Sequence, residues 1–358
     1  MMRVFARRGL AIAAAAAVLA LTGCGTVSYY YQAMRGQFEI LAKRRPIPQV
    51  VADAKEPELV RQHLTSLLEM RDFAVRELHL PDNGSYRSYS DLRRPFVLWN
   101  VFAAREFSND LERWCFPIAG CIDYRGYFDH DAAREYAAGI SERGGYDVYV
   151  GGVPAYSTLG WFDDPVLSTF VRYPEAELAR LLFHELAHQV VYVKDDSMFN
   201  ESFATAVEEE GMERWVALDP TRRRDGEWQA AQRRRQDFQT LVLTFRGRLD
   251  ELYRSDAPLE RKRSAKRDIL DALAAEYRRL RASWGGYPGY DRWFADKPNN
   301  AQLASVAIYT QRVPEFRAVF RREGRDFARF YEAVKAVAVL PPAQREQRLA
   351  DAPTERVR

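Results

Sequence analysis

Apolar residues recur with a helical period in some parts of the chain and alternate or cluster in short runs in others. From Glu56 to Leu80, leucines recur at helical spacing and stop before Pro81, which predicts a helix. Charged amphipathic segments dominate from Ser202 to the end, and they predict further helices. Between these regions lie β-prone runs bounded by Gly and Pro, at Phe96–Phe102, Tyr124–Phe128, Tyr146–Val150 and Tyr156–Phe162. The chain therefore predicts a predominantly helical α+β fold, with a small β-sheet before a central helix.

Two pairs of helices follow from the same pattern. Leu178, Leu182 and Leu186 predict a buried helix whose first turn can accommodate Pro174. A polar turn at 194–197 separates it from a second helix that opens near Phe199 and could fold back against the first. Further on, we expect a long helical hairpin, with arms at Trp228–Tyr253 and Leu259–Trp284, that covers the cleft beside the buried helix.

The buried helix carries the pattern H-E-x-x-H. His184 and His188 are four residues apart, so both can point a ring nitrogen at one metal ion from the same helix face. Glu185 lies about 100° around the helix, beside the metal, where it can take a proton from water as a general base. The alternative is a core helix in which the two histidines only satisfy hydrogen bonds.

A catalytic zinc usually takes three protein ligands, so a third is required. Residues 200–204 read Asn-Glu-Ser-Phe-Ala and resemble the N-E-x-x-A helix of the gluzincin metallopeptidases, which implies that Glu201 is the third ligand. The connector of twelve residues after His188 is shorter than in the well-known gluzincins. Glu208, seven residues further along and on nearly the same helix face, competes for the role. For either glutamate the alternative is an exposed helix face.

The amino terminus predicts export. Three arginines precede an apolar run from Gly9 to Leu21, and small residues lead to Cys24. This start resembles the bacterial lipobox, which implies that residues 1–23 are removed and that Cys24 is lipidated. Gly25 favours the outer membrane over the inner one by the same resemblance, with the catalytic domain in the periplasm. The alternative is an ordinary signal peptide or a single anchoring helix.

Charge argues against nucleic acid as a partner. Residues 1–23 carry three of the 53 basic side chains and none of the 50 acidic ones, so the rest of the chain is balanced. Local arginine runs such as 233–235 are interpreted as solvated helix surface.

Only three cysteines occur. With Cys24 lipidated, Cys115 and Cys121 remain, and an oxidising periplasm favours a disulfide between them, contributing about 2 kcal/mol. A zinc site is the alternative for these thiols, but no second cysteine pair exists to complete it.

Two more elements are candidates for the substrate site. The stretch Gly151–Gly160 is the best candidate for an edge strand that pairs with a peptide backbone, unless it is a plain hairpin. Tyr309 is our candidate for a hydrogen-bond donor to the oxyanion, against the alternative of a core tyrosine. Asp163 and Asp164 could receive a free amino group, but turn acids are common. Position 205, where gluzincins have an acid that orients a ligand, is Thr205, and Asp195 or Asp196 could substitute.

Together, these motifs make the chain similar to the zinc-dependent aminopeptidase lipoproteins of proteobacteria. The resemblance extends over nearly the whole mature chain. The resemblance implies a gluzincin-like core, Zn²⁺ as cofactor and a peptide as substrate. We expect a tether at 24–55, a catalytic α+β core at 56–220 and a helical region at 221–358 that packs on it. The rival hypotheses are a zinc endopeptidase and a non-catalytic envelope lipoprotein that binds a partner.

Overall fold

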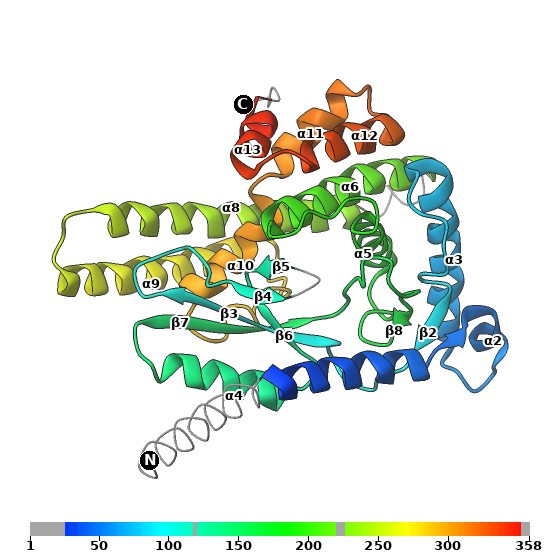
Figure 1. Cartoon of the computed structure of the whole chain (residues 1–358), viewed down its shortest axis with the longest axis horizontal. Coiled ribbons are helices and arrows are strands. Elements are labelled where there is room, and N and C mark those ends of the chain that lie inside the picture. The colour runs from blue at the N-terminus through cyan, green and yellow to red at the C-terminus, as the bar shows by residue number, and fades with distance from the viewer. Residues whose placement is uncertain (1–25, 117–119, 220–225, 352–358) are drawn as a thin grey trace, which may run out of the picture.

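A computed structural model describes residues 26–116, 120–219 and 226–351. Helices dominate and the sheets are small, so the predicted helical α+β class is confirmed. The long hairpin of α8 (Glu227–Arg254) and α9 (Leu259–Ser283) projects to one side of the molecule (Figure 1). Three short helices, α11 (Val313–Arg322), α12 (Phe327–Ala338) and α13 (Pro342–Ala350), form a group beside α6 (Ser197–Leu218) (Figure 1).

A three-stranded antiparallel sheet lies between the hairpin and the amino-terminal helices. Its order is β6 (Arg125–Tyr127), β3 (Leu98–Arg105) and β7 (Tyr146–Val153), so β7 is an edge strand. Alternate residues of β3 face opposite sides, as the strand period requires. Val101 and Ala103 pack toward α4 (His130–Ser141), whereas Phe102 and Ala104 pack toward α10 (Asn300–Thr310). The sheet thus has a helix on each face.

One predicted strand is wrong. Residues 156–162 form an irregular loop instead of a strand. Thr158 provides the physical reason, because its backbone N–H and its hydroxyl both donate to the carboxylate of Asp164, at 2.9 and 2.8 Å. Its hydroxyl oxygen also accepts from the N–H of Phe162. These local bonds occupy backbone groups that a strand would need for its ladder. A second small sheet, not predicted, joins β1 (Arg45–Pro46), β2 (Ser88–Ser90) and β8 (Val166–Leu167).

The segment expected to be a tether is ordered. Residues 26–42 form a helix that runs along one side of the molecule and leads into α2 (Ile47–Ala52) and α3 (Glu58–Leu78) (Figure 1). Gly36 is buried where this helix crosses Phe128, since a Cβ there would lie 2.0 Å from the ring. The proposed leader and Cys24 lie outside the described residues. Among the described helices, none combines the length and apolarity that crossing a bilayer would require.

The principal core lies where α3, α5 (Glu175–Ala187), α6 and the C-terminal helices meet. Aromatic side chains fill it, and the ring centres of Phe183 on α5 and Phe73 on α3 lie 5.6 Å apart. Gly211 lets α6 approach α3 and α5 closely, because a Cβ at this position would lie 2.8 Å from Leu78 of α3. This core contains side chains from both the 56–220 and the 221–358 segments. The division into two domains stays a prediction.

Candidate metal centre

The centre is built on two neighbouring helices, α5 and α6, and a short connector. α6 begins at Ser197, where Asp196 caps it by accepting from the N–H of Phe199. The side chain of Asn200 then closes the connector on itself, because it accepts from the N–H of Val193 at 2.7 Å and donates to the carbonyl of the same residue at 2.8 Å. The asparagine of the motif therefore fixes the loop that brings the next residue, Glu201, beside α5.

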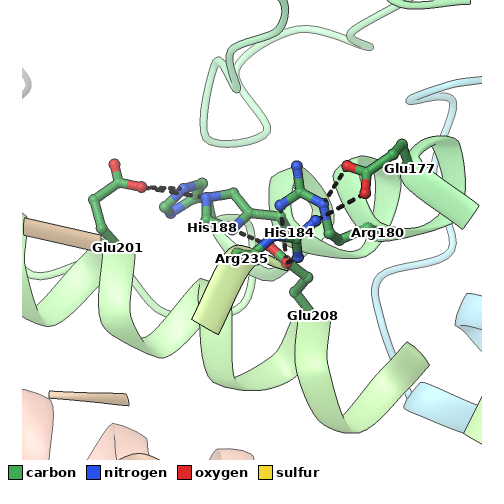
Figure 2. A network of polar contacts seen from close by, with 7 residues as sticks. All are labelled: Glu177, Arg180, His184, His188, Glu201, Glu208 and Arg235. Atoms are coloured by element: carbon green, nitrogen blue, oxygen red, sulfur yellow. Dashed lines mark hydrogen bonds and ion pairs between the residues drawn. The ribbon is translucent and has the colours of Figure 1, made fainter. Parts of the chain in front are cut away.

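Three side chains meet at the α5–α6 interface, as the sequence predicted. One ligand atom each from His184, His188 and Glu201 lies within 4.8 Å of the other two. The Oε2 atom of Glu201 is 3.2 Å from Nε2 of His184 and 3.6 Å from Nε2 of His188 (Figure 2). α5 ends at Ala187, earlier than its apolar pattern indicates, but His188 keeps helical torsion angles of −59° and −21°. The spacing of the two imidazoles is therefore preserved. These three residues could hold a metal ion.

Glu208 lies on the other side of His184. Its Oε2 atom accepts from Nδ1 of the imidazole at 3.1 Å, and this glutamate is not one of the three residues that converge. A carboxylate on the far nitrogen of a metal-binding histidine fixes the ring orientation and its tautomer. In this arrangement Glu201 could serve as a ligand, and Glu208 could orient the imidazole of His184. This role of Glu208 was not predicted from the sequence.

The electrostatics of the centre fit a cation. Burial on its own lowers the pKa of His184, but its hydrogen bonds to Glu201 and Glu208 raise that pKa to about 10. Burial likewise acts to raise the pKa of Glu201, and the two histidines lower it to about 2. The two carboxylates therefore favour a positive charge at His184. A metal ion could replace a proton on Nε2, while the N–H at Nδ1 donates to Glu208.

A buried network of ion pairs surrounds Glu208 (Figure 2). The Oε1 atom of Glu208 lies 2.9 Å from Nη1 of Arg180 and 3.2 Å from Nη1 of Arg235, and both arginines also pair with Glu177. Burial acts to raise the pKa of Glu208, but Arg180, His184 and Arg235 lower it to about 2. Arg235 belongs to the run interpreted as solvated surface. That interpretation is wrong for this residue, since its side chain is only 18 % exposed.

Glu185 projects into the same cavity as the three converging side chains. The cavity has a volume of about 600 Å³, and Glu185 is buried in its wall. Burial raises the pKa of Glu185 above its usual range. A carboxylate with a raised pKa holds a proton more readily than an exposed one, which suits a group that accepts a proton and returns it. Among the described residues, Nδ1 of His188 is buried and has no hydrogen-bond partner.

Tyr309 comes from α10 and lines this cavity. Its ring centre lies 6.2 Å from that of His184. Burial raises the pKa of Tyr309 well above the usual value, so the hydroxyl stays protonated and can donate. Tyr124 lines the same cavity and also has a pKa raised by burial. Tyr124 was predicted only as part of a strand, because nothing in its local pattern distinguishes it from a core residue.

The edge of the sheet reaches the cavity. Gly152 and Val153 at the end of β7 line it, followed by Pro154, Ala155 and Tyr156 of the irregular stretch. The candidate edge strand Gly151–Gly160 is therefore a strand only as far as Val153. The acids considered for other roles lie elsewhere, since Asp164 is bonded to Thr158 and Asp196 caps α6.

A disulfide-bonded hairpin contacts the connector between α5 and α6. Cys115 and Cys121 lie opposite each other on β4 (Trp114–Phe116) and β5 (Gly120–Ile122), and the predicted disulfide is confirmed. The N–H of Cys121 donates to Oδ1 of Asp195 at 2.6 Å, and Arg113 donates to the carbonyl of Asp195 at 2.6 Å. Gly120 has a φ of +79°, and a Cβ there would lie 2.5 Å from Asp195. The bridge thus stiffens the hairpin against the metal-centre loop.

A family model described as "Putative aminopeptidase" matches residues 28–349, so the chain belongs to that family. No curated protein and no solved structure matches the chain. Membership supports peptidase activity on a peptide substrate.

Proposed function

We propose that this chain is a zinc-dependent aminopeptidase, anchored by a lipid on Cys24 with its catalytic domain in the periplasm. The observation that carries the proposal is the convergence of His184, His188 and Glu201 within 4.8 Å at a cavity that also contains a buried carboxylate, Glu185. Family membership supports the aminopeptidase assignment. The lipobox resemblance supports the anchor, and Gly25 favours the outer membrane.

Zinc suits this donor set because two imidazole nitrogens and one carboxylate oxygen are typical ligands of catalytic zinc. His184, His188 and Glu201 would hold the ion, and Glu208 would keep the His184 ring in its binding orientation. When bound, zinc supplies a Lewis acid that polarises a carbonyl and increases the acidity of water. The chain's own residues perform the remaining steps.

Glu185 moves the proton in the proposed reaction. Its carboxylate takes a proton from the attacking water and gives it to the nitrogen of the leaving amine. The hydroxyl of Tyr309 donates a hydrogen bond to the oxygen of the scissile carbonyl as negative charge develops there. The edge of β7 near Gly152 pairs with the substrate backbone and orients the peptide across the cavity.

Metal content and a single variant test this proposal. The purified protein should contain about one zinc per chain and hydrolyse chromogenic amino-acid amides. Glu185→Gln should keep the metal and lose about 10²- to 10⁴-fold in kcat, as expected for loss of a general base. Glu175→Gln on the same helix is the matched control, because Glu175 is exposed and should have no effect.

Three results would count against the proposal, and each points elsewhere. A protein without stoichiometric zinc and without hydrolysis would favour a non-catalytic envelope lipoprotein. Hydrolysis of peptides with a blocked amino terminus would identify an endopeptidase. Unchanged turnover in Glu185→Gln would refute its role as the base.

A further inference from the structure

A second cavity adjoins the metal cavity and is larger, with a volume of about 870 Å³. The two share wall residues from several elements, including Gly152 and Val153 of β7, Arg180 of α5, Arg235 and Gln239 of α8, and Tyr309 of α10. A peptide that follows the edge of β7 past the metal centre therefore enters this second cavity. We refer to it below as the hairpin cavity, because α8 forms much of its wall.

The wall of the hairpin cavity is rich in aromatic side chains. Phe238 of α8 stacks on Tyr290 with ring centres 4.1 Å apart, and Trp293 meets Phe238 edge-on at 5.2 Å. Trp228 and Tyr287 also belong to this apolar part of the lining. Rings fixed by mutual stacking make a preformed surface for a large apolar group, since they lose little entropy on binding.

Among the described residues, one positive charge in the polar part of the wall has no paired carboxylate. Arg180 and Arg235 are each paired with both Glu177 and Glu208, so they are neutralised. Arg234 differs: in the described part of the chain no carboxylate pairs with it, and its Nε atom is buried without a hydrogen-bond partner. Its guanidinium carbon lies 4.1 Å from the centre of the Tyr287 ring, which holds the side chain at the wall.

We propose that the hairpin cavity is a substrate subsite that binds a carboxylate at Arg234 and an apolar side chain against the aromatic wall. This inference rests on the proposed peptidase function and adds a substrate class, peptides with an acidic group beyond the scissile bond. Guanidinium and carboxylate form charge-assisted hydrogen bonds, and partial burial strengthens them. The carboxylate has two possible sources, the carboxyl terminus of a short peptide or an Asp or Glu side chain.

Peptide pairs separate the two sources. Kinetics are measured on a short peptide with a large apolar residue, as the free acid and as the C-terminal amide. A second pair carries Glu or Gln at an internal position, both with amidated ends. In one of the two pairs, we expect kcat/KM for the charged peptide to be about tenfold or more above that for its neutral counterpart, mainly because its KM is lower.

Arg234→Gln tests the residue itself. This variant should abolish the preference for the charged peptide while its hydrolysis of a single amino-acid amide stays at the wild-type level. Arg233→Gln is the matched control, since Arg233 is the exposed neighbour on the same helix. A preference that survives in Arg234→Gln, or the absence of any preference in the wild type, would overturn the proposal.

Binding distinguishes this proposal from the peptidase function. Calorimetry of the Glu185→Gln full-length protein with the free-acid peptide should give a Kd about tenfold below that for the amide, and Arg234→Gln should remove the difference. If the wild type hydrolyses nothing yet this difference is found, the peptidase proposal fails and the carboxylate site stands. If hydrolysis occurs without the difference, only the carboxylate site fails.

A separate observation concerns the helix at residues 26–42. Val27, Tyr31, Met34 and Phe38 follow one another at spacings of four, three and four, and are 68, 62, 55 and 67 % exposed. These spacings place all four on one stripe of the helix. The opposite side packs inward, since Ile40 is 1 % exposed and Tyr29 lines the metal cavity. The helix therefore presents an apolar stripe to the outside.

The position of the stripe in the chain indicates its partner. The apolar run 9–21 and Cys24 come immediately before it, so the proposed lipid would bring this helix to the membrane first. Trp161 and Phe162 are also 69 and 46 % exposed. Their loop runs beside the end of the helix, where Arg44 donates to the carbonyl of Asp163 at 3.1 Å. Aromatic and apolar side chains of this kind are favoured at the lipid headgroup region.

We infer that the apolar stripe docks on a lipid bilayer and lies in its interfacial plane. This inference depends on the proposed lipid anchor for the approach to the membrane, but the contact itself is made by the described helix. Because the opposite side of the helix lines the metal cavity through Tyr29 and Ala33, docking would keep the catalytic cleft within about one helix diameter, 10 Å, of the lipid surface.

Fluorescence quenching tests the contact. Phe38→Cys and Arg279→Cys full-length proteins are labelled with an NBD fluorophore and reconstituted in phosphatidylethanolamine–phosphatidylglycerol vesicles that contain a shallow spin-labelled lipid. Position 279 on α9 is the control, because its side chain is 78 % exposed outside the stripe. We expect quenching severalfold stronger at position 38 than at position 279.

Three other outcomes would contradict the inference in distinguishable ways. Vesicles that retain the protein without selective quenching at position 38 would overturn the docking alone. Failure of the wild type to float with vesicles would overturn both the anchor and the docking. A blue-shifted emission at position 38 without vesicles would show that another part of the chain covers the stripe.

Discussion

Nη1 of Arg235, on the α8–α9 hairpin, lies 3.2 Å from Oε1 of Glu208, the carboxylate whose other oxygen accepts from His184. One carboxylate therefore connects the hairpin to an imidazole of the metal centre. α8 contributes to the orientation of that imidazole although it provides no residue to the group that converges on the metal position. The hairpin was expected to cover the cleft, and its contribution to the cavity walls agrees with that placement.

Glu208→Gln should weaken zinc binding about 10- to 100-fold, as is typical when the partner of a metal-binding histidine is changed. The amide accepts a weaker hydrogen bond from Nδ1, and Arg180 and Arg235 are left to share the single countercharge of Glu177. A competition titration against a zinc chelator measures the effect. Glu213→Gln, on a half-exposed turn of the same helix, should bind zinc as the wild type does. Equal affinity in both variants would show that Glu208 does not orient the ligand.

Arg235→Met should lower the free energy of unfolding by about 1 to 3 kcal/mol, because Glu177 and Glu208 would then share the single countercharge of Arg180. Arg233→Met is the exposed control on the same helix. Urea denaturation of Arg235→Met, of Glu208→Gln and of the variant with both substitutions gives the coupling energy between the two residues. Strict additivity would contradict a direct interaction between Arg235 and Glu208.

Tyr309→Phe should reduce kcat about 10²-fold while KM and zinc content change little, because the hydroxyl would act only when charge develops on the carbonyl oxygen. Steady-state kinetics on an amino-acid amide measures it. Tyr173→Phe is a control, since Tyr173 lines the hairpin cavity and not the metal cavity. Wild-type kcat in Tyr309→Phe, with a loss in Tyr124→Phe, would transfer the role to Tyr124.

Asp164 should make the protein less stable as the pH rises. Burial raises the pKa of Asp164 to about 7 despite its hydrogen bonds from Thr158, whereas the unfolded value is near 4. Between these values the folded state binds more protons than the unfolded state, so the stability contributed is complete below about pH 4 and is lost toward pH 7.

Denaturation of the wild type and of Asp164→Asn across this range isolates the effect. The difference in unfolding free energy should change by up to about 1.4 kcal/mol per pH unit between pH 4 and 7, in favour of the variant at higher pH. A difference that does not depend on pH would show that Asp164 titrates normally.

Removal of the disulfide should loosen the metal-centre loop. The double variant Cys115→Ser with Cys121→Ser should lose about 2 kcal/mol of stability, as expected for a short ring. Zinc should dissociate faster, because Asp195 in the connector is held by the N–H of Cys121. Thermal denaturation and zinc release to a chromogenic chelator measure the two effects. The wild type treated with a reductant should behave as the variant does.

Local pattern predicted the elements that carry the chemistry. The helix of His184 and His188, the second helix with Glu201, the hairpin arms and the disulfide all follow from periodicity, turn residues and cysteine spacing. Contacts between distant segments were not predictable in this way. Arg235 reads as a surface residue because nothing nearby in sequence indicates that Glu208 will be buried beside it.

The errors in secondary structure have a related cause. Residues 156–162 have the composition of a strand, but Asp164 captures the backbone and the hydroxyl of Thr158 and keeps the segment irregular. The helix at residues 26–42 was missed because its two apolar sides leave no clean amphipathic period to detect.

The closure of the connector by Asn200 bears on the order in which the protein folds. His184 and Glu208 are separated by only 24 positions, so the imidazoles and carboxylates at the α5–α6 interface all belong to one local helix–loop–helix unit. Local contacts of this kind form early because little chain entropy is lost in bringing them together. We expect the imidazoles and carboxylates to assemble before Tyr309 and the hairpin arrive, so that a nascent chain could capture its ion while the substrate cleft is still open.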